Sequence, residues 1–101
     1  MNLVELTERV RKSVGDESGL EATIKFDFGE EGIIYIDGLS NPNAVNNENK
    51  ESKITIKVSR ENFEKIIDHK LNPKVALMTG RMRLRGDIRI AMRLDKVFGT
   101  G

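Results

Sequence analysis

The sequence predicts an α+β domain: a single, mostly antiparallel sheet of about four to five strands, covered on one face by helices. One observation is that apolar and polar residues alternate over several short segments, which is typical of half-buried strands. Another is that apolar residues recur every three or four positions in the segments around them, which indicates amphipathic helices. A chain of 101 residues has room for one core, so we expect residues 1–101 to form one domain.

The N-terminal part predicts a helix followed by a hairpin. Helical spacing of apolar residues over 2–14 indicates the helix, and Gly15 would end it. Strands over residues 20–28 and 33–39 enclose four residues, 29–32, a length suited to a hairpin turn. Their alternation turns these apolar side chains toward the core: Ala22, Ile24, Phe26, Phe28, Ile34 and Ile36.

The middle of the chain predicts a loop, a strand and a second helix. The opposite face of the second strand carries Ile33 and Tyr35, so we expect that face to be partly covered. Residues 40–51 show no period and are expected to form a long surface loop. Residues 53–58 alternate again and are expected to continue an antiparallel meander, with Ile54, Ile56 and Val58 inward. Ser59 would cap a helix whose buried stripe consists of Phe63, Ile66 and Ile67.

Residues 72–94 change period three times within a short distance. The Asn-Pro pair at 72–73 favours a helix start, and Gly80 would end that helix as a left-handed cap. Residues 81–85 alternate between apolar residues and arginines, as in a half-buried strand. The Gly-Asp pair at 86–87 would end the strand and cap a last helix. Its apolar stripe consists of Ile88, Ala91 and Met92, extended by Ile90, Leu94 and Phe98.

This part of the chain resembles the signature end of the sterol carrier protein 2 (SCP2) family. The shared pattern is a short helix ending in Met and Gly, a basic alternating strand, a glycine, and a helix containing Ala-Met-basic-Leu. Here the pattern is carried by Leu71-Asn72-Pro73, by residues 78–86 and by Ala91-Met92-Arg93-Leu94. Residues 59–63 are similar to the strand-to-helix corner of that family, so the resemblance spans 20–94. Asp87 and Arg89 depart from the usual asparagine and small residue.

The methionines of this segment have two interpretations. On composition alone, Met78, Met82 and Met92 are gap-fillers of a small core, or they form an adaptable surface for apolar partners. The resemblance favours the second interpretation, because it implies an apolar tunnel for lipids. It implies a tunnel floor, supplied by the sheet, of Phe26, Phe28, Ile34, Ile36 and Ile56. It implies that the rest of the lining comes from Phe63, Ile67, Leu77, Met78, Met82, Leu84, Ile88 and Met92.

The charges are distributed unevenly along the chain. Residues 1–52 hold five basic and eleven acidic residues, and residues 53–101 hold twelve basic and five acidic ones, so pairing between the halves is expected. Arg81, Arg83 and Arg85 share one face of a predicted strand. They form either a solvated face that pairs with acidic neighbours such as Glu21 and Asp27, or a strip that attracts anionic membrane surfaces or a phosphate-bearing ligand.

Little in the sequence points to catalysis. His69 is the only histidine and ends a predicted helix, where a solvent-facing side chain favoured by the helix dipole is usual. No carboxylate pair lies in an apolar setting, no His/Asp cluster has the spacing of metal ligands, and there is no cysteine. We therefore expect no catalytic residue, no metal and no cofactor.

The composition also limits the partners and the cellular location that we expect for this protein. No apolar run approaches the ~18–20 residues that a membrane span needs. We expect neither a secretory signal nor a peroxisomal tripeptide, and a cytoplasmic location follows by default. The nearly balanced charge and the scattered aromatic residues argue against nucleic acid as a partner.

Taken with the resemblance, these observations predict a non-enzymatic lipid-binding or transfer protein. It would hold a fatty acid, acyl-CoA, sterol-like or isoprenoid ligand in an apolar tunnel, through hydrophobic burial. Transient contact with an anionic membrane surface would assist the exchange. The alternative is an interaction or assembly module, whose apolar surface is covered by homodimerisation or by a partner enzyme. In that alternative, a short C-terminus leaves the tunnel open.

Overall fold

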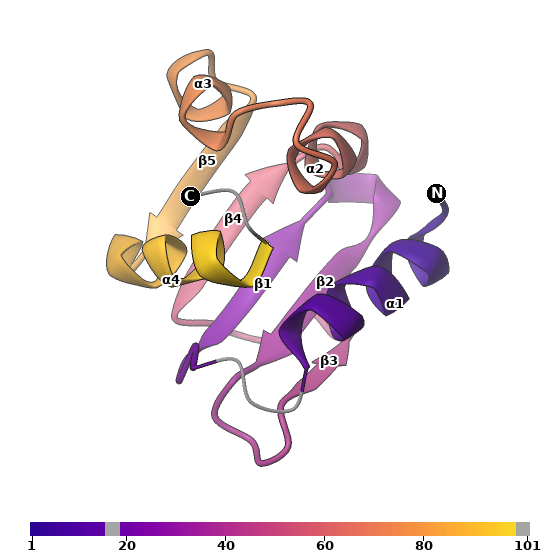
Figure 1. Ribbon diagram of the computed structural model, residues 1–101, viewed down its shortest axis with the longest axis vertical. Helices are drawn as coiled ribbons and strands as arrows, with labels where there is room; N and C mark the ends of the chain where they lie inside the picture. The colour runs from indigo at the N-terminus through magenta and orange to yellow at the C-terminus, as the bar shows by residue number, and fades with distance from the viewer. Residues whose placement is uncertain (16–18, 99–101) are drawn as a thin grey trace.

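Five strands form one sheet, and the helices lie against one of its faces (Figure 1). The computed structural model describes residues 1–15 and 19–98, apart from the side chain of Lys96. The prediction that the chain carries no peroxisomal tripeptide concerns residues 99–101, which lie outside the described residues. The strands are β1 (Thr23–Asp27), β2 (Ile33–Asp37), β3 (Ala44–Asn46), β4 (Ile54–Val58) and β5 (Met82–Gly86). The helices are α1 (Leu3–Val14), the 3-10 turn η1 (Gly29–Glu31), α2 (Arg60–Ile67), α3 (Pro73–Met78) and α4 (Ile88–Phe98). The predicted α+β class is confirmed.

The sheet order is β3-β2-β1-β4-β5, and one part of the predicted topology is wrong. We expected residues 53–58 to continue an antiparallel meander, but β4 pairs parallel to β1, with Phe26 opposite Ile56. The other neighbouring pairs are antiparallel, so the sheet is mostly antiparallel as predicted. Because β4 lies beside β1 and not beside β2, the last strand and helix of the chain join the sheet on the side away from β3.

The segment expected to be an irregular loop, 40–51, contains the short strand β3. This strand pairs with β2 and buries Val45 against the core. The chain then returns over the outer face of the sheet, since Lys25 Nζ donates to Asn49 Oδ1 (3.0 Å) and Tyr35 Oη donates to the Glu51 carbonyl (3.3 Å). This return covers Tyr35, which is buried as the sequence led us to expect.

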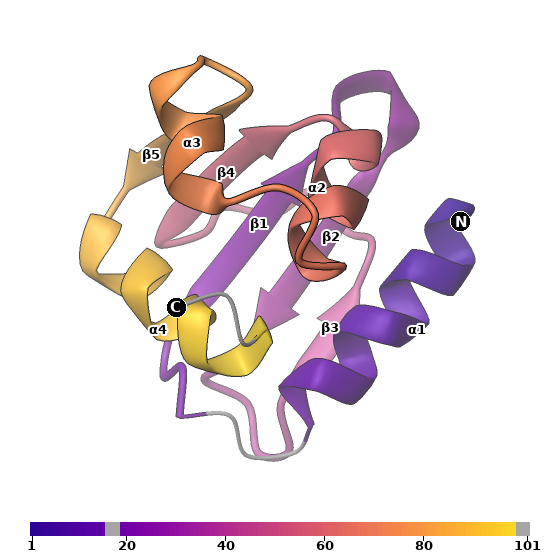
Figure 2. The same cartoon turned by 45° about the horizontal axis from the view of Figure 1, so that its top comes forward.

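Helix α1 covers the β2 and β3 side of the inner face (Figure 2). It begins with a capping box between Asn2 and Glu5, and Gly15 follows its last turn. Its buried stripe of Leu6, Val10 and Val14 completes the core over these strands. The face over β1, β4 and β5 is left for the helices of the second half.

The α2–α3 corner is set by local hydrogen bonds. The Ser59 side chain accepts from the Asn62 N–H at the start of α2, as predicted. Beyond the end of α2, His69 adopts φ 61°, a left-handed conformation uncommon for a residue other than glycine. The Asn72 side chain accepts from the Lys74 N–H (2.8 Å), and Pro73 occupies the first turn of α3, which confirms the predicted start of that helix.

At the end of β2, the carboxylate of Asp37 organises a turn. It accepts hydrogen bonds from the Ser40 hydroxyl (2.7 Å) and from the backbone N–H groups of Leu39 (3.0 Å) and Ser40 (3.2 Å). The bond from the Ser40 hydroxyl is the largest cause that lowers the pKa of Asp37 below its ordinary value of 3.8. The ionised carboxylate is therefore the form that stabilises this turn.

Asp37→Asn is expected to lower the free energy of unfolding by less than about 1 kcal/mol at neutral pH. Since the native pKa lies below that of the unfolded chain, the stabilisation is fully present above about pH 4 and is lost as the pH falls through the native pKa. Urea unfolding of both proteins over a pH series measures this. A difference in stability that does not shrink in acid would contradict the role of the charge.

Candidate functional site

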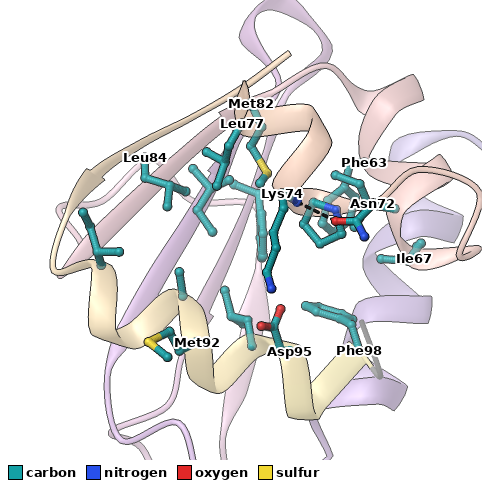
Figure 3. A pocket seen from close by; sticks show the side chains of 17 residues that line it. Phe63, Ile67, Asn72, Lys74, Leu77, Met82, Leu84, Met92, Asp95 and Phe98 are labelled. Carbon is teal, nitrogen blue, oxygen red and sulfur yellow. Dashed lines mark hydrogen bonds between the residues drawn. The ribbon is translucent and has the colours of Figure 1, made fainter. Parts of the chain in front are cut away.

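A cavity of about 460 Å³ lies between the sheet and the helices of the second half (Figure 3). Its floor comes from β1, β4 and β5, and its walls come from α2, α3 and α4. Most of its lining is apolar, because the inner-face residues of these strands meet the apolar sides of the helices: Phe26, Ile56, Phe63, Ile66, Ile67, Leu77, Met82, Leu84, Ile88, Ala91, Met92, Leu94 and Phe98.

A cluster of aromatic rings forms part of the cavity wall. The ring centroids of Phe26 and Phe63 are 4.7 Å apart, and Phe98 meets both rings edge-on at 6.2 Å and 6.0 Å. Phe28 packs behind Phe63, with their centroids 5.3 Å apart. These tilted and edge-to-face arrangements are the favoured ones for aromatic pairs, so the ring contacts stabilise this wall.

The polar part of the lining gathers at one place, between α3 and α4. It includes Asn72 and Lys74 from the start of α3 and Asp95 from α4. Figure 3 shows the Lys74 side chain extending from α3 toward the carboxylate of Asp95. Asn72 is held by its cap to the Lys74 N–H, so its side chain has a fixed place at this end of the cavity.

Nine of the thirteen apolar residues predicted for the tunnel line this cavity. They come from strands and helices that are far apart in the sequence, and the structure brings them together: Phe26, Ile56, Phe63, Ile67, Leu77, Met82, Leu84, Ile88 and Met92. Ligand binding at these residues stays a prediction.

Four predicted tunnel residues do not line the cavity. Ile34 and Ile36 are fully buried in β2, on the part of the sheet that α1 covers. Phe28 lies behind the ring of Phe63. Met78 is 85% exposed, because it lies two positions after the buried Ala76 and so points to the opposite side of α3.

Other residues of the lining were not among the predicted tunnel residues. Ala91, Leu94 and Phe98 were assigned to the apolar stripe of the last helix, and Ile66 to the stripe of α2. Their helical spacing alone could have placed them beside Ile67 and Met92. The polar residues Lys74 and Asp95 had no signal in the sequence, since their meeting depends on the angle between α3 and α4.

The three arginines lie away from the cavity. Arg83 pairs in register with Lys57 and Arg85 with Thr55, on the outer face of the sheet, as predicted from the alternation with Met82 and Leu84. Among residues 1–15 and 19–98, no ion pair joins Arg81, Arg83 or Arg85 to a carboxylate. The expected pairing of this strip with acidic neighbours is therefore absent from the described part of the chain.

Pairing between the acidic and basic halves does occur elsewhere. Arg9 of α1 meets Asp68 after α2 at 2.5 Å, and Arg60 of α2 meets Glu31 at 3.1 Å. These pairs hold the N-terminal part against α2. Both ion pairs lie at the surface, so each contributes about 1 kcal/mol or less to the free energy of unfolding.

Two features are absent from the part of the chain that the structure describes. No three His, Asp or Glu side chains there are grouped so as to hold a metal ion. No helix in that part of the chain has the length and apolar character needed to cross a membrane. A second cavity, of about 390 Å³, has a largely polar and charged lining that includes Glu21, Lys53 and Arg93, which suits an acyl chain poorly.

One sheet with helices on one face and an apolar cavity between them defines a small α+β binding domain. Residues 3–99 match the SCP-2 sterol transfer family, and the chain therefore belongs to this family. Among curated proteins, it is 26% identical over 103 residues to hydroxysteroid dehydrogenase-like protein 2 of Xenopus laevis. That match covers 96% of this chain and 25% of the relative, so the chain spans about a quarter of that protein's length.

Solved structures share the fold at low sequence identity. The sterol carrier protein domain 2 of Helicoverpa armigera matches with a TM-score of 0.71 at 20% identity, over 94% of this chain and 84% of that one. Palmitated SCP2L2 from Aedes aegypti matches with a TM-score of 0.69 at 20% identity, over 97% of this chain and 95% of that one. Family membership and fold together support a lipid-binding or transfer domain.

Proposed function

We propose that residues 1–101 form one non-enzymatic lipid-binding and transfer domain. Its ligand, a fatty acid, acyl-CoA, sterol-like or isoprenoid lipid, places its apolar part in the cavity of about 460 Å³. This apolar cavity, in a chain of the SCP-2 sterol transfer family, is the observation that carries the proposal. Its volume falls within the ~300–1,000 Å³ usual for small-molecule sites. The palmitated state of the Aedes aegypti protein supports a fatty-acyl ligand for this fold.

The driving force for binding is burial of apolar ligand surface, worth ~25 cal/mol per Å² removed from water. The cavity needs no fixed polar anchor for this, and it needs no chemical step. His69 is exposed and does not line the cavity, which supports a protein without turnover of its own. The cytoplasmic location stays a prediction.

A direct test is titration with an environment-sensitive fluorescent fatty acid, followed by displacement with unlabelled long-chain lipids. Saturable binding with displacement by lipids of different headgroups would support the proposal. Absence of saturable binding by the folded protein, or displacement by short polar acids alone, would refute it.

The polar end of the cavity gives the ligand an orientation. Lys74 and Asp95 face one another between α3 and α4, so the headgroup would lie here while the tail lies against β4 and β5 (Figure 3). The ammonium of Lys74 would then pair with a carboxylate or phosphate group of the ligand. A neutral headgroup would gain nothing from this charge.

Lys74→Gln is expected to weaken binding of a long-chain fatty acid about fivefold, because a solvent-exposed ion pair contributes about 1 kcal/mol. Binding of the fatty alcohol of equal length should be unchanged. Competition titrations with both ligands measure this, and Lys70→Gln, an exposed lysine outside the cavity lining, is the matched control. Equal weakening for acid and alcohol would mean that Lys74 contributes packing and not charge.

The alternative function, an assembly module covered by a second copy or a partner enzyme, rests on apolar side chains that α3 and α4 leave exposed. Light scattering with and without fatty acid separates it from the proposal. A stable dimer that dissociates when lipid is added would favour the assembly module.

A further inference from the structure

Exposed apolar side chains gather on α3 and α4. Among the described residues, eight large hydrophobic side chains are exposed, and only Met1, Val4 and Leu39 lie elsewhere. The others are here named the rim: Val75 (45%), Leu77 (39%), Met78 (85%), Ile88 (61%) and Met92 (70%). Isolated exposed apolar residues are ordinary, but a group of this kind marks an interaction surface.

The rim is continuous with the opening of the cavity. Leu77, Ile88 and Met92 line the cavity and are also exposed, so they form its edge. Figures 1 and 2 show α3, β5 and the start of α4 along one side of the molecule. A partner bound to the rim would therefore lie directly against the opening through which a ligand enters.

Basic residues lie next to the rim along the chain. Arg81 follows Met78 by three residues, and Arg85 precedes Ile88 by three residues; both arginines are exposed. Residues 72–98 hold seven basic and two acidic residues, a formal net charge of +5. One of the two carboxylates, that of Asp87, is paired with Arg89 at 2.9 Å. This hydrogen bond is the largest cause that lowers the pKa of Asp87, so the pair stays ionised.

We propose that the rim docks on an anionic lipid surface and so places the opening of the cavity against that surface. This proposal rests on the proposed lipid-binding function. An apolar group bordered by cations matches the interface of an anionic bilayer, where methionine and isoleucine enter the acyl boundary and arginine meets the headgroups. A lipid tail would then pass from the bilayer into the cavity along apolar side chains, without crossing water.

The same charges disfavour a second copy of this chain as the occupant. Two rims face to face would bring together two segments of net charge +5 each, and like charges at an interface oppose association. The arginines act at the edge of the docked surface, since Arg83 and Arg85 lie on the outer face of β5 and do not reach the cavity.

The chain contains no tryptophan, so a single introduced one reports on its own position. Met78→Trp, on the rim but outside the cavity lining, is expected to shift its emission to the blue on phosphatidylcholine vesicles that contain phosphatidylserine. It should shift little without phosphatidylserine, and high salt should reverse the shift. Leu39→Trp is the control, because Leu39 is equally apolar and 70% exposed but lies on the turn after β2. No shift at position 78, or a shift at position 39 alone, would overturn the proposal.

Met78→Ser tests the consequence for transfer. We expect pickup of a fluorescent fatty acid from anionic vesicles to slow about tenfold, while equilibrium affinity for the soluble probe without vesicles is unchanged. Leu39→Ser should change neither. Two results would overturn the docking proposal. One is a normal rate of pickup by the folded Met78→Ser variant. The other is a blue shift of Met78→Trp that grows with protein concentration in the absence of vesicles, which would identify a second copy of the chain as the occupant of the rim. Failure of the wild type to bind the soluble probe would instead refute the lipid-binding function.

Discussion

Gly86→Ala is expected to lower the free energy of unfolding by about 3–4 kcal/mol. Gly86 ends β5 with φ 118°, a backbone conformation that residues with a Cβ rarely adopt. A Cβ at this position would lie 2.3 Å from the carbonyl oxygen of Lys53 and 2.9 Å from the Cα of Ile54. Both are backbone atoms, and Ile54 is the partner of Gly86 in the β4–β5 ladder, so neither can retreat without opening that pairing.

Gly80→Ala is the matched control, because Gly80 also has a positive φ (75°) but nothing lies within 4 Å of its added Cβ. Gly80→Ala should lower the free energy of unfolding by about 1–2 kcal/mol, because it introduces backbone strain but no close contact. Urea unfolding of the two variants and the wild type measures the difference. If both variants lose the same free energy of unfolding, the close contact between the added Cβ and the Lys53 carbonyl relaxes without destabilising the protein.

Gly86 also connects stability to the site. Its close approach to Lys53 and the hydrogen bond from the Asp87 N–H to the Lys53 carbonyl (3.1 Å) fix where α4 leaves the sheet. The position of α4 in turn sets the width of the cavity, since Ala91, Met92 and Leu94 form one of its walls.

The sequence predicted the elements well because each has a local signal. Asn72 and Pro73 begin α3 through a side-chain cap and a fixed φ, and the alternation around Leu84 identifies β5. Strand β3 was missed because its three residues, Ala44–Asn46, are too few for a visible alternation. Only its pairing with β2 makes it a strand.

The candidate site was predicted less completely because alternation identifies the face of a strand but not its neighbour. Ile34 and Phe26 both point to the inner face, and no local pattern distinguishes one from the other. Once β4 pairs with β1, the cavity lies over β1, β4 and β5, and β2 is covered by α1. The exposure of Met78 and Met92 depends on which side of α3 and of α4 packs against the rest of the domain: Ala76 and Leu94 are buried, whereas these methionines lie on other sides of their helices.

These exposed methionines connect the fold with the proposed exchange of ligand. Ile90 and Leu94 anchor α4 in the core, whereas Ile88 and Met92 on the neighbouring side remain at the edge of the cavity. The sequence predicted one apolar stripe, and the structure divides it into a buried side and an exposed one. A flexible, polarisable side chain at such an edge suits varied apolar ligands.

Ala91→Trp is expected to weaken binding of a fluorescent fatty acid about fiftyfold to a hundredfold while leaving the fold intact. Ala91 is half-buried and lines the wall of the cavity formed by α4, so an indole there fills space that the ligand would occupy. If the indole displaces ~100 Å² of apolar ligand contact, the loss is ~2.5 kcal/mol of binding free energy. The free energy of unfolding should be unchanged or higher, because the new side chain buries apolar surface in an existing cavity of about 460 Å³.

Val4→Trp is the matched control, since it adds the same indole on the exposed side of α1, where Val4 is 71% exposed. It should bind the probe as the wild type does. Fluorescence titration gives the affinities, and urea unfolding of the same samples shows that each variant is folded. Wild-type affinity in a folded Ala91→Trp variant would remove this cavity from the lipid site. Equal loss in Val4→Trp would mean that the added indole, and not the filled cavity, interferes with the probe.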